Sequence, residues 1–194
     1  TIVFANRSIQ RATIPKFIKY IKPYAFEYCK KLNAIEFSED SEIVSIGKNA
    51  FRLTCIESIC IPSSLEEWSA YNSNLKKITV SPSNKNFGYL DDKHQIIVGK
   101  SDIESDVFDT IVFANRDIEK ATIPKFIKYI KPYAFCKFKK LNQVDFSANS
   151  ELLIIGKYAF SLAHIIIIKI PKSVIDIGKF AFSHCDQLIK VSLE

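Results

Sequence analysis

Cysteine and histidine are the side chains of this sequence that are best suited to covalent or metal chemistry. The 194 residues include five cysteines and three histidines. A nucleophilic Cys–His pair needs a fixed side-chain geometry and a third group that orients the histidine. The adjacent residues His184 and Cys185 do not favour that geometry, and the sequence has no Cys-x-x-Cys or similar ligand spacing. We therefore expect no catalytic residue, no metal site and no cofactor.

Three of the cysteines recur at one place in a repeated pattern. Cys29, Cys55 and Cys185 follow an Ala-Phe pair by three or four residues. A small residue at a recurring position is typical of a buried site, and free cysteine is among the most often buried residue types. An odd number of cysteines leaves at least one unpaired within the chain. The sequence does not decide whether Cys29 and Cys55 form a disulfide, because disulfide geometry is demanding.

Lysines recur as two matching triplets, and two interpretations of them stay open. The segment IPKFIKYIKP occurs twice, and the formal net charge of the chain is +6. The lysines either form a solvated edge that keeps the protein soluble, or form basic patches that meet sulfated or sialylated glycans or anionic lipid. Nucleic acid is disfavoured, since neither a recognition helix nor a base-stacking platform is evident. The triplets are Lys16, Lys19 and Lys22, and Lys125, Lys128 and Lys131.

A duplication and a shorter repeat organise the elements that must position these side chains. Residues 1–51 return at 110–160 with 36 of 51 positions identical. Within each uninterrupted stretch of the chain, Ala-Phe pairs recur at short intervals, with spacings of 25, 25 and 22 residues, and Ile-Gly pairs precede several of them. A repeat of about 20–29 residues is typical of leucine-rich solenoids.

One complete repeat begins at Ile170 and carries a specific pattern. It runs I-P-x-x-V-x-x-I-G-x-x-A-F-x-x-C-x-x-L-x-x-V-x-L. This pattern resembles the BspA-like leucine-rich repeat family, and the resemblance covers nearly the whole chain. It implies a right-handed, curved solenoid of short parallel strands with helical or irregular outer segments. Members of that family are surface antigens and adhesins of microbes and protists.

Two kinds of strand are expected in each repeat. Segments with L-x-x-I-x-I spacing alternate at their ends and predict about eight short strands. A second, shorter strand precedes each glycine, which permits a bend there. The Ala-Phe segment is expected to form an outer helical turn, with its phenylalanines aligned as an internal ladder. The longer strands are expected at 32–37, 56–61, 75–80, 141–146, 165–170 and 188–193, and more weakly at 9–14 and 118–123; the shorter ones are expected at 44–46, 153–155 and 174–177.

The repeat pattern is interrupted between residues 63 and 109. Trp68 takes the place of the isoleucine in Ile-Gly, and the Ala-Phe pair that should follow is missing. Residues 81–109 are an irregular insertion in which 87–90 and 95–98 read as a hairpin. We predict one domain, a single solenoid over residues 1–194 with this insertion as a bulge.

The outward strand positions are the usual binding surface of such solenoids. They are polar without a dominant charge, so they either bind a partner or are solvated. The resemblance favours a non-enzymatic binding module at the cell surface that adheres to a host protein or glycan; the alternative is an intracellular scaffold for protein–protein interaction. We expect no membrane span, because no apolar run reaches about 18 residues, and we expect end-to-end self-association. The outward residues are Glu36, Ser58, Cys60, Thr79, Gln143, Asp145, Lys169, Lys190 and Ser192.

Overall fold

The computed structural model describes residues 1–68 and 74–193. The chain forms two compact units, Thr1–Gly88 and Tyr89–Glu194. Each unit is a solenoid of short parallel strands, which confirms the predicted fold class. A single solenoid running through residues 1–194 stays a prediction, and the units are described below one at a time.

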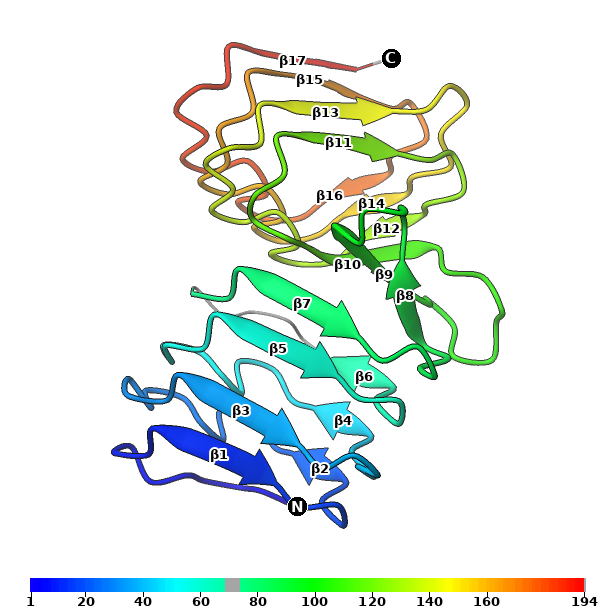
Figure 1. The fold of residues 1–194 in the computed structure, drawn as a ribbon. Helices are drawn as coiled ribbons and strands as arrows, with labels where there is room; N and C mark the ends of the chain where they lie inside the picture. Colours follow the sequence, from blue (N-terminus) through cyan, green and yellow to red (C-terminus); the bar gives the residue numbers. More distant parts are fainter. Residues whose placement is uncertain (69–73, 194) are drawn as a thin grey trace. The chain divides into compact units, whose positions relative to one another are not determined.

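The longer strands form the first face of each unit (Figure 1), with four strands in each unit. Every one of them begins two residues later than predicted, because the first apolar residue of the pattern lies in the preceding turn. Leu32, for example, donates its N–H to the carbonyl of Cys29. In the first unit, β1 (Arg11–Ile14) pairs with β3 (Ala34–Phe37) and β5 (Ser58–Ile61) pairs with β7 (Lys77–Val80). In the second unit, β11 (Lys120–Ile123), β13 (Gln143–Phe146), β15 (Ile167–Ile170) and β17 (Lys190–Leu193) form one parallel sheet.

A second sheet in each unit contains the strands of only two residues. The first unit has β2 (Tyr20–Ile21), β4 (Ser45–Ile46) and β6 (Glu67–Trp68). Trp68 lies opposite Ile46, which confirms its predicted place in the repeat. The sheet that contains the short strands of the second unit has the order β16 (Asp176–Ile177), β14 (Ile154–Ile155), β12 (Tyr129–Ile130), β10 (Thr110–Ala114), β9 (Ile96–Gly99) and β8 (Phe87–Tyr89). The boundary between the units falls within β8.

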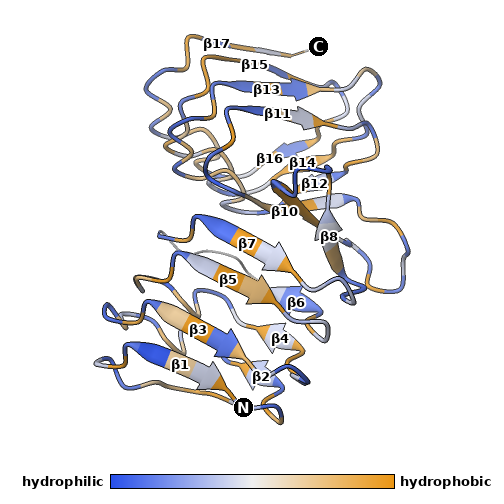
Figure 2. Ribbon diagram, viewed as in Figure 1, coloured by the Kyte–Doolittle hydropathy of each residue, from blue (hydrophilic) through white to orange (hydrophobic). Residues whose placement is uncertain are grey.

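Apolar side chains from both sheets fill the interior of each unit. Buried and more exposed residues alternate along the longer strands, and Figure 2 shows the matching change between hydrophilic and hydrophobic residues for β7. This alternation sends every second side chain inward. The predicted phenylalanine ladder is present: Phe135 stacks on Phe160 at 5.0 Å and Phe160 on Phe182 at 5.3 Å, with planes 3° apart in both pairs. Within the first unit, the rings of Phe26 and Phe51 lie 5.4 Å apart.

The outer segments are successive turns, and residues 1–68 and 74–193 contain no helix. The irregular form of the prediction therefore holds, and the helical form does not. Alternate N–H groups donate to the next coil, from Tyr24 to Lys48 and from Phe26 to Ala50, while the N–H groups between them close local turns. This pattern places Tyr24 in the left-handed region with φ of 64°. Hydrogen bonds between coils thus replace the hydrogen bonds that a helix would make within itself.

The glycines of the Ile-Gly pairs serve close packing rather than a bend. The left-handed positions of the described segments are taken by residues other than glycine. A Cβ atom on Gly156 would lie 2.5 Å from the backbone nitrogen of Pro132 and 2.7 Å from the carbonyl oxygen of Ile130. Glycine is therefore needed because backbones of neighbouring coils approach closely, which corrects the sequence-based explanation.

Candidate binding surface

A shallow depression lies on the outward face of the second unit. It has a volume of about 570 Å³ and runs over β13 and β15. Gln143, Asp145 and Lys169, three of the predicted binding residues, line it together with exposed apolar residues. Ile167 stands opposite Gln143 in the parallel register and is 49% exposed. The depression therefore combines a carboxylate, an amide and an ammonium group with an apolar wall.

Asp145 is the electrostatic centre of this depression. Its Oδ2 atom lies 2.8 Å from Nζ of Lys120 and accepts a 2.8 Å hydrogen bond from Nε2 of Gln143. The bond from Lys120, with help from Gln143 and the charge of Lys169, lowers the pKa of the Asp145 carboxyl. The carboxylate therefore stays ionised at neutral pH, with one lysine on the strand at each side of it.

The remaining predicted residues of this face lie on β17. Lys190 stands opposite Ile167, and Ser192 stands opposite Lys169. Both therefore extend the row of outward positions from β13 and β15 to the next strand. Three lysines accompany the single carboxylate of Asp145 on this face, so its charge is mainly positive.

The first unit presents a smaller depression on its own outward face. It measures about 300 Å³ and includes Glu36 on β3 and Cys60 on β5. Glu36 accepts a 2.8 Å bond from Arg11 of β1. Thr79 stands opposite Cys60, so it belongs to the same face, and Ser58 stands opposite Lys77 at the other end of the strands. The predicted residues of the first unit therefore share one face.

The first lysine triplet is only partly free for a ligand. Nζ of Lys16 lies 3.4 Å from Oδ2 of Asp40 on the next coil. Lys19 and Lys22 are exposed and flank β2, whose backbone pairs with β4. An exposed pair such as Lys16–Asp40 contributes about 0–1 kcal/mol, so it limits the lysine only weakly.

The second triplet contains a lysine with a carboxylate beside it. Lys125 and Lys131 are exposed, whereas Lys128 is half-buried near Asp109. Burial acts to raise the pKa of Asp109, but hydrogen bonds from Ser101 and Thr110 and the charge of Lys128 outweigh it, so the pKa is lowered. The N–H and Oγ of Ser101 approach the two carboxylate oxygens at 2.9 and 2.6 Å. Asp109 therefore anchors the segment after β9. Lys128, which is half-buried beside this carboxylate, is less accessible to a ligand than Lys125 and Lys131.

The cysteines differ in exposure although three of them share a repeat position. The structure records all five as free thiols. Cys29 is buried as predicted, whereas Cys55 at the equivalent position is exposed, which corrects the prediction for that residue. The Cys55 thiol donates to the carbonyl of Lys30 at 2.9 Å, and the Cys185 thiol donates to that of Phe160 at 3.1 Å. The position therefore serves to bond one coil to its neighbour.

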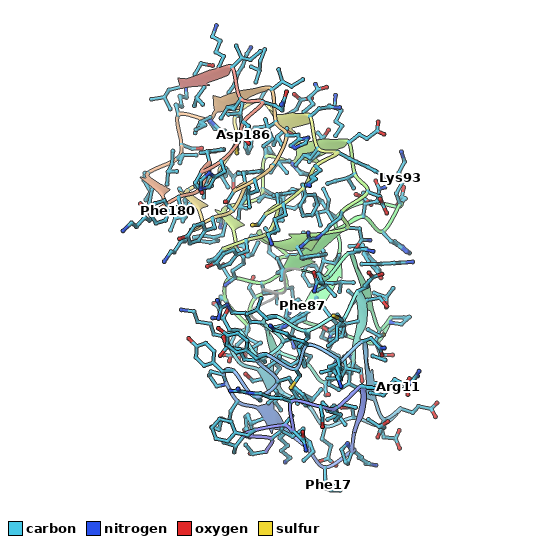
Figure 3. The ribbon with its side chains drawn as sticks, turned by 90° about the vertical axis from the view of Figure 1, so that its left-hand side faces the viewer. Arg11, Phe17, Phe87, Lys93, Phe180 and Asp186 are labelled. Atoms are coloured by element: carbon cyan, nitrogen blue, oxygen red, sulfur yellow. The ribbon has the colours of Figure 1, made fainter. Side chains whose placement is uncertain are left out.

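An aromatic stack on the outer side of the second unit was missed by sequence reasoning. Tyr133 stacks on Tyr158 at 5.2 Å, and Tyr158 stacks on Phe180 at 5.1 Å. Nζ of Lys179 lies 4.9 Å from the centre of the Phe180 ring. Phe180 projects outward from this side of the unit (Figure 3). The signal in the sequence is an aromatic residue directly before most Ala-Phe pairs.

Residues 1–68 and 74–193 lack two features that would suggest other functions. No group of three or more His, Cys, Asp or Glu side chains there is arranged to hold a metal ion. The same residues contain no helix with the length and hydropathy that crossing a membrane requires.

Comparison with known proteins shows which family has this repeat. The sequence pattern of the BspA type leucine rich repeat region matches residues 1–90 and 106–194 in six copies. No curated protein matches the chain. The pneumococcal vaccine antigen PcpA superposes with a TM-score of 0.76 at 19% identity, over 96% of this chain and 51% of that one.

Two other solved structures share the fold. A leucine-rich repeat protein from Eubacterium ventriosum has a TM-score of 0.65 at 19% identity, over 97% of this chain and 61% of that one. A leucine rich cell surface protein from Faecalibacterium prausnitzii has a TM-score of 0.58 at 17% identity, over 96% and 60%. The chain thus spans between half and three fifths of these proteins. Since the family pattern covers nearly all of its residues, the chain belongs to the BspA-type leucine-rich repeat family.

Proposed function

We propose that this chain is a non-enzymatic binding module that recognises a protein or glycan ligand through the outward face of its longer strands. The observation that carries the proposal is the depression over β13 and β15, which Asp145 and Lys169 line together with the exposed Ile167. Protein-binding surfaces combine an apolar centre with a polar rim. This face has that composition, and it is built on strands, which hold side chains in place better than loops do.

We further propose that the module acts at the cell surface, in adhesion. One structural neighbour is described as a cell surface protein and another as a vaccine antigen, and both share this fold. Surface biotinylation of cells that make the protein tests the location. Labelling of the chain is the expected result, and an exclusively cytosolic signal would reject the surface location in favour of an intracellular scaffold.

A binding screen with paired variants tests the proposed face. The chain is applied to arrays of matrix proteins and glycans, together with the double variant Asp145→Ala/Lys169→Ala. The control Asp186→Ala/Lys179→Ala removes one charge of each sign from exposed positions of the same unit, away from the depression. We expect the first variant to lose any ligand that the parent and the control retain. Equal binding by all three proteins would place the ligand elsewhere.

The lysine triplets support a second route, binding of acidic glycans. Lys19, Lys22, Lys125 and Lys131 are exposed, and the chain has a net charge of +6. Heparin retention measured against salt tests this route, because contacts to a polyanion weaken as salt rises. A variant with these four lysines changed to glutamine should elute earlier. Elution of the parent no later than a neutral control protein would end this part of the proposal.

A further inference from the structure

The outward faces of the two units are built from matching strands that carry different side chains. Strands β5 and β15 correspond at the same offset as the duplicated block. Both strands keep isoleucine at their two inward positions, and each of these four side chains is at most 5% exposed. The outward positions differ, because Ser58 and Cys60 of β5 correspond to Ile167 and Lys169 of β15. The packing of the core therefore explains the inward residues and not the outward ones.

The depression over β13 and β15 carries a positive charge that its own residues leave uncompensated. The carboxylate of Asp145 is already paired, since its Oδ2 atom lies 2.8 Å from Nζ of Lys120. Lys169 lines the same depression, and in the part of the chain that the structure describes it forms no ion pair. The ammonium group of Lys169 is therefore available to an anionic group of a ligand.

The depression of the first unit carries the opposite charge. Glu36 is paired with Arg11 at 2.8 Å. Glu39 also lines this depression, and among the described residues it forms no ion pair. The residue that matches Glu39 in the second unit is Ala148. A negative charge is therefore left over in the first unit, where the second unit has a positive one.

Two exposed isoleucines form an apolar wall in the depression of the second unit. Ile166 and Ile167 are 43% and 49% exposed, and both line the depression. The matching residues of the first unit are polar: Ser58, and Glu57, which is paired with Lys76 at 2.7 Å. Covering an aliphatic wall with the hydroxyl groups of a sugar gains little, because those groups lose water without a new hydrogen bond. The wall therefore favours an apolar side chain of a protein over a glycan.

We propose that the depression of the second unit binds an acidic segment of a protein partner, with a carboxylate against Lys169 and an apolar side chain against Ile166 and Ile167. This inference rests on the proposed function and names the ligand of the same face. The first unit lacks the lysine and the wall, and its uncompensated charge is negative, so it should repel the same segment. Selectivity then comes from outward residues of β15, because the two units share the fold that holds them.

Selection from a phage-displayed library of random peptides supplies the probe. The full chain is immobilised, and the bound peptides are sequenced and compared with the starting library. Enrichment of Asp and Glu next to aliphatic or aromatic residues is the expected result. The selected peptides are then synthesised with a fluorescent label and titrated with the parent and its variants by fluorescence anisotropy.

Three variants test whether the peptides bind in the depression. Lys169→Glu should weaken binding by about fivefold or more, since it exchanges the attraction of an exposed ion pair for a repulsion of similar size. Ile167→Ser introduces the residue of the first unit and should weaken binding by a similar factor, because the ligand would remove this half-exposed side chain from water. The control Lys179→Glu makes the same charge change outside the depression and should alter the affinity by less than about twofold.

Failure of this inference is distinct from failure of the proposed function. Absence of selected peptides, absence of acidic enrichment, or equal losses with Lys169→Glu and Lys179→Glu would overturn the inference. Binding of acidic glycans but of no peptide, abolished by Lys169→Glu, would also overturn it and would leave the proposed function standing. The proposed function itself fails if Asp145→Ala/Lys169→Ala keeps every array ligand of the parent.

Discussion

Removal of one ring from the phenylalanine ladder should destabilise the second unit more than any surface substitution. Phe160 is fully buried, with Phe135 at 5.0 Å on one side and Phe182 at 5.3 Å on the other. Burial of the ring contributes about 1.5–3 kcal/mol, and each of its two ring pairs adds about 0.5–1.5 kcal/mol. We therefore expect Phe160→Ala to lower the free energy of unfolding by about 3–5 kcal/mol, the usual range for such a change.

Chemical denaturation followed by far-UV circular dichroism measures this loss. Phe160→Leu separates the two contributions, because it keeps the apolar bulk and removes only the stacking; it should cost about 1–3 kcal/mol. Phe180→Ala is the matched control, since Phe180 also stacks on a ring, that of Tyr158, but is 47% exposed. If Phe160→Ala costs no more than Phe180→Ala, the ladder does not support the solenoid and the reasoning fails.

Three further predictions concern the backbone, a carboxylate and the thiols. Gly156→Ala should cost more than about 2 kcal/mol, well above the effect of propensity alone, because a Cβ would meet the backbone of the neighbouring coil; an unchanged denaturation midpoint would contradict this. Asp109→Asn should destabilise by about 1–3 kcal/mol at pH 7. The pKa of Asp109 in the folded protein lies below its ordinary value of 3.8, so its contribution to stability is complete above that value and is lost as pH falls through the folded pKa. The free energies of unfolding of the parent and the variant should therefore converge in acid. A difference that stays constant down to pH about 2 would refute the assignment. A thiol reagent should react immediately with the exposed Cys55 and Cys60 of the native protein. The buried Cys29 and Cys136 should react only after unfolding. Mass spectrometry identifies the labelled cysteines, and immediate labelling of the buried two would contradict the prediction.

The spacing of apolar residues was enough to predict the eight longer strands and the ladder. Period-two alternation reports which side chains face inward, and the recurrence of Ala-Phe reports which rings meet between coils. The same spacing predicted that Trp68 occupies the repeat position of the isoleucine in Ile-Gly, and Trp68 does lie opposite Ile46. A repeat makes such inferences dependable because every coil has nearly the same surroundings as the next.

Tertiary structure decided the features that depend on contacts between coils. Neither the left-handed backbone at Tyr24 nor the close approach at Gly156 can be read from local propensity, because both follow from the hydrogen bonds and spacing of adjacent coils. The exposure of Cys55 beside the burial of Cys29 has the same origin. Val112 and Phe113 are buried because β9 pairs with β10, since burial depends on the neighbouring strand as well as on the residues themselves.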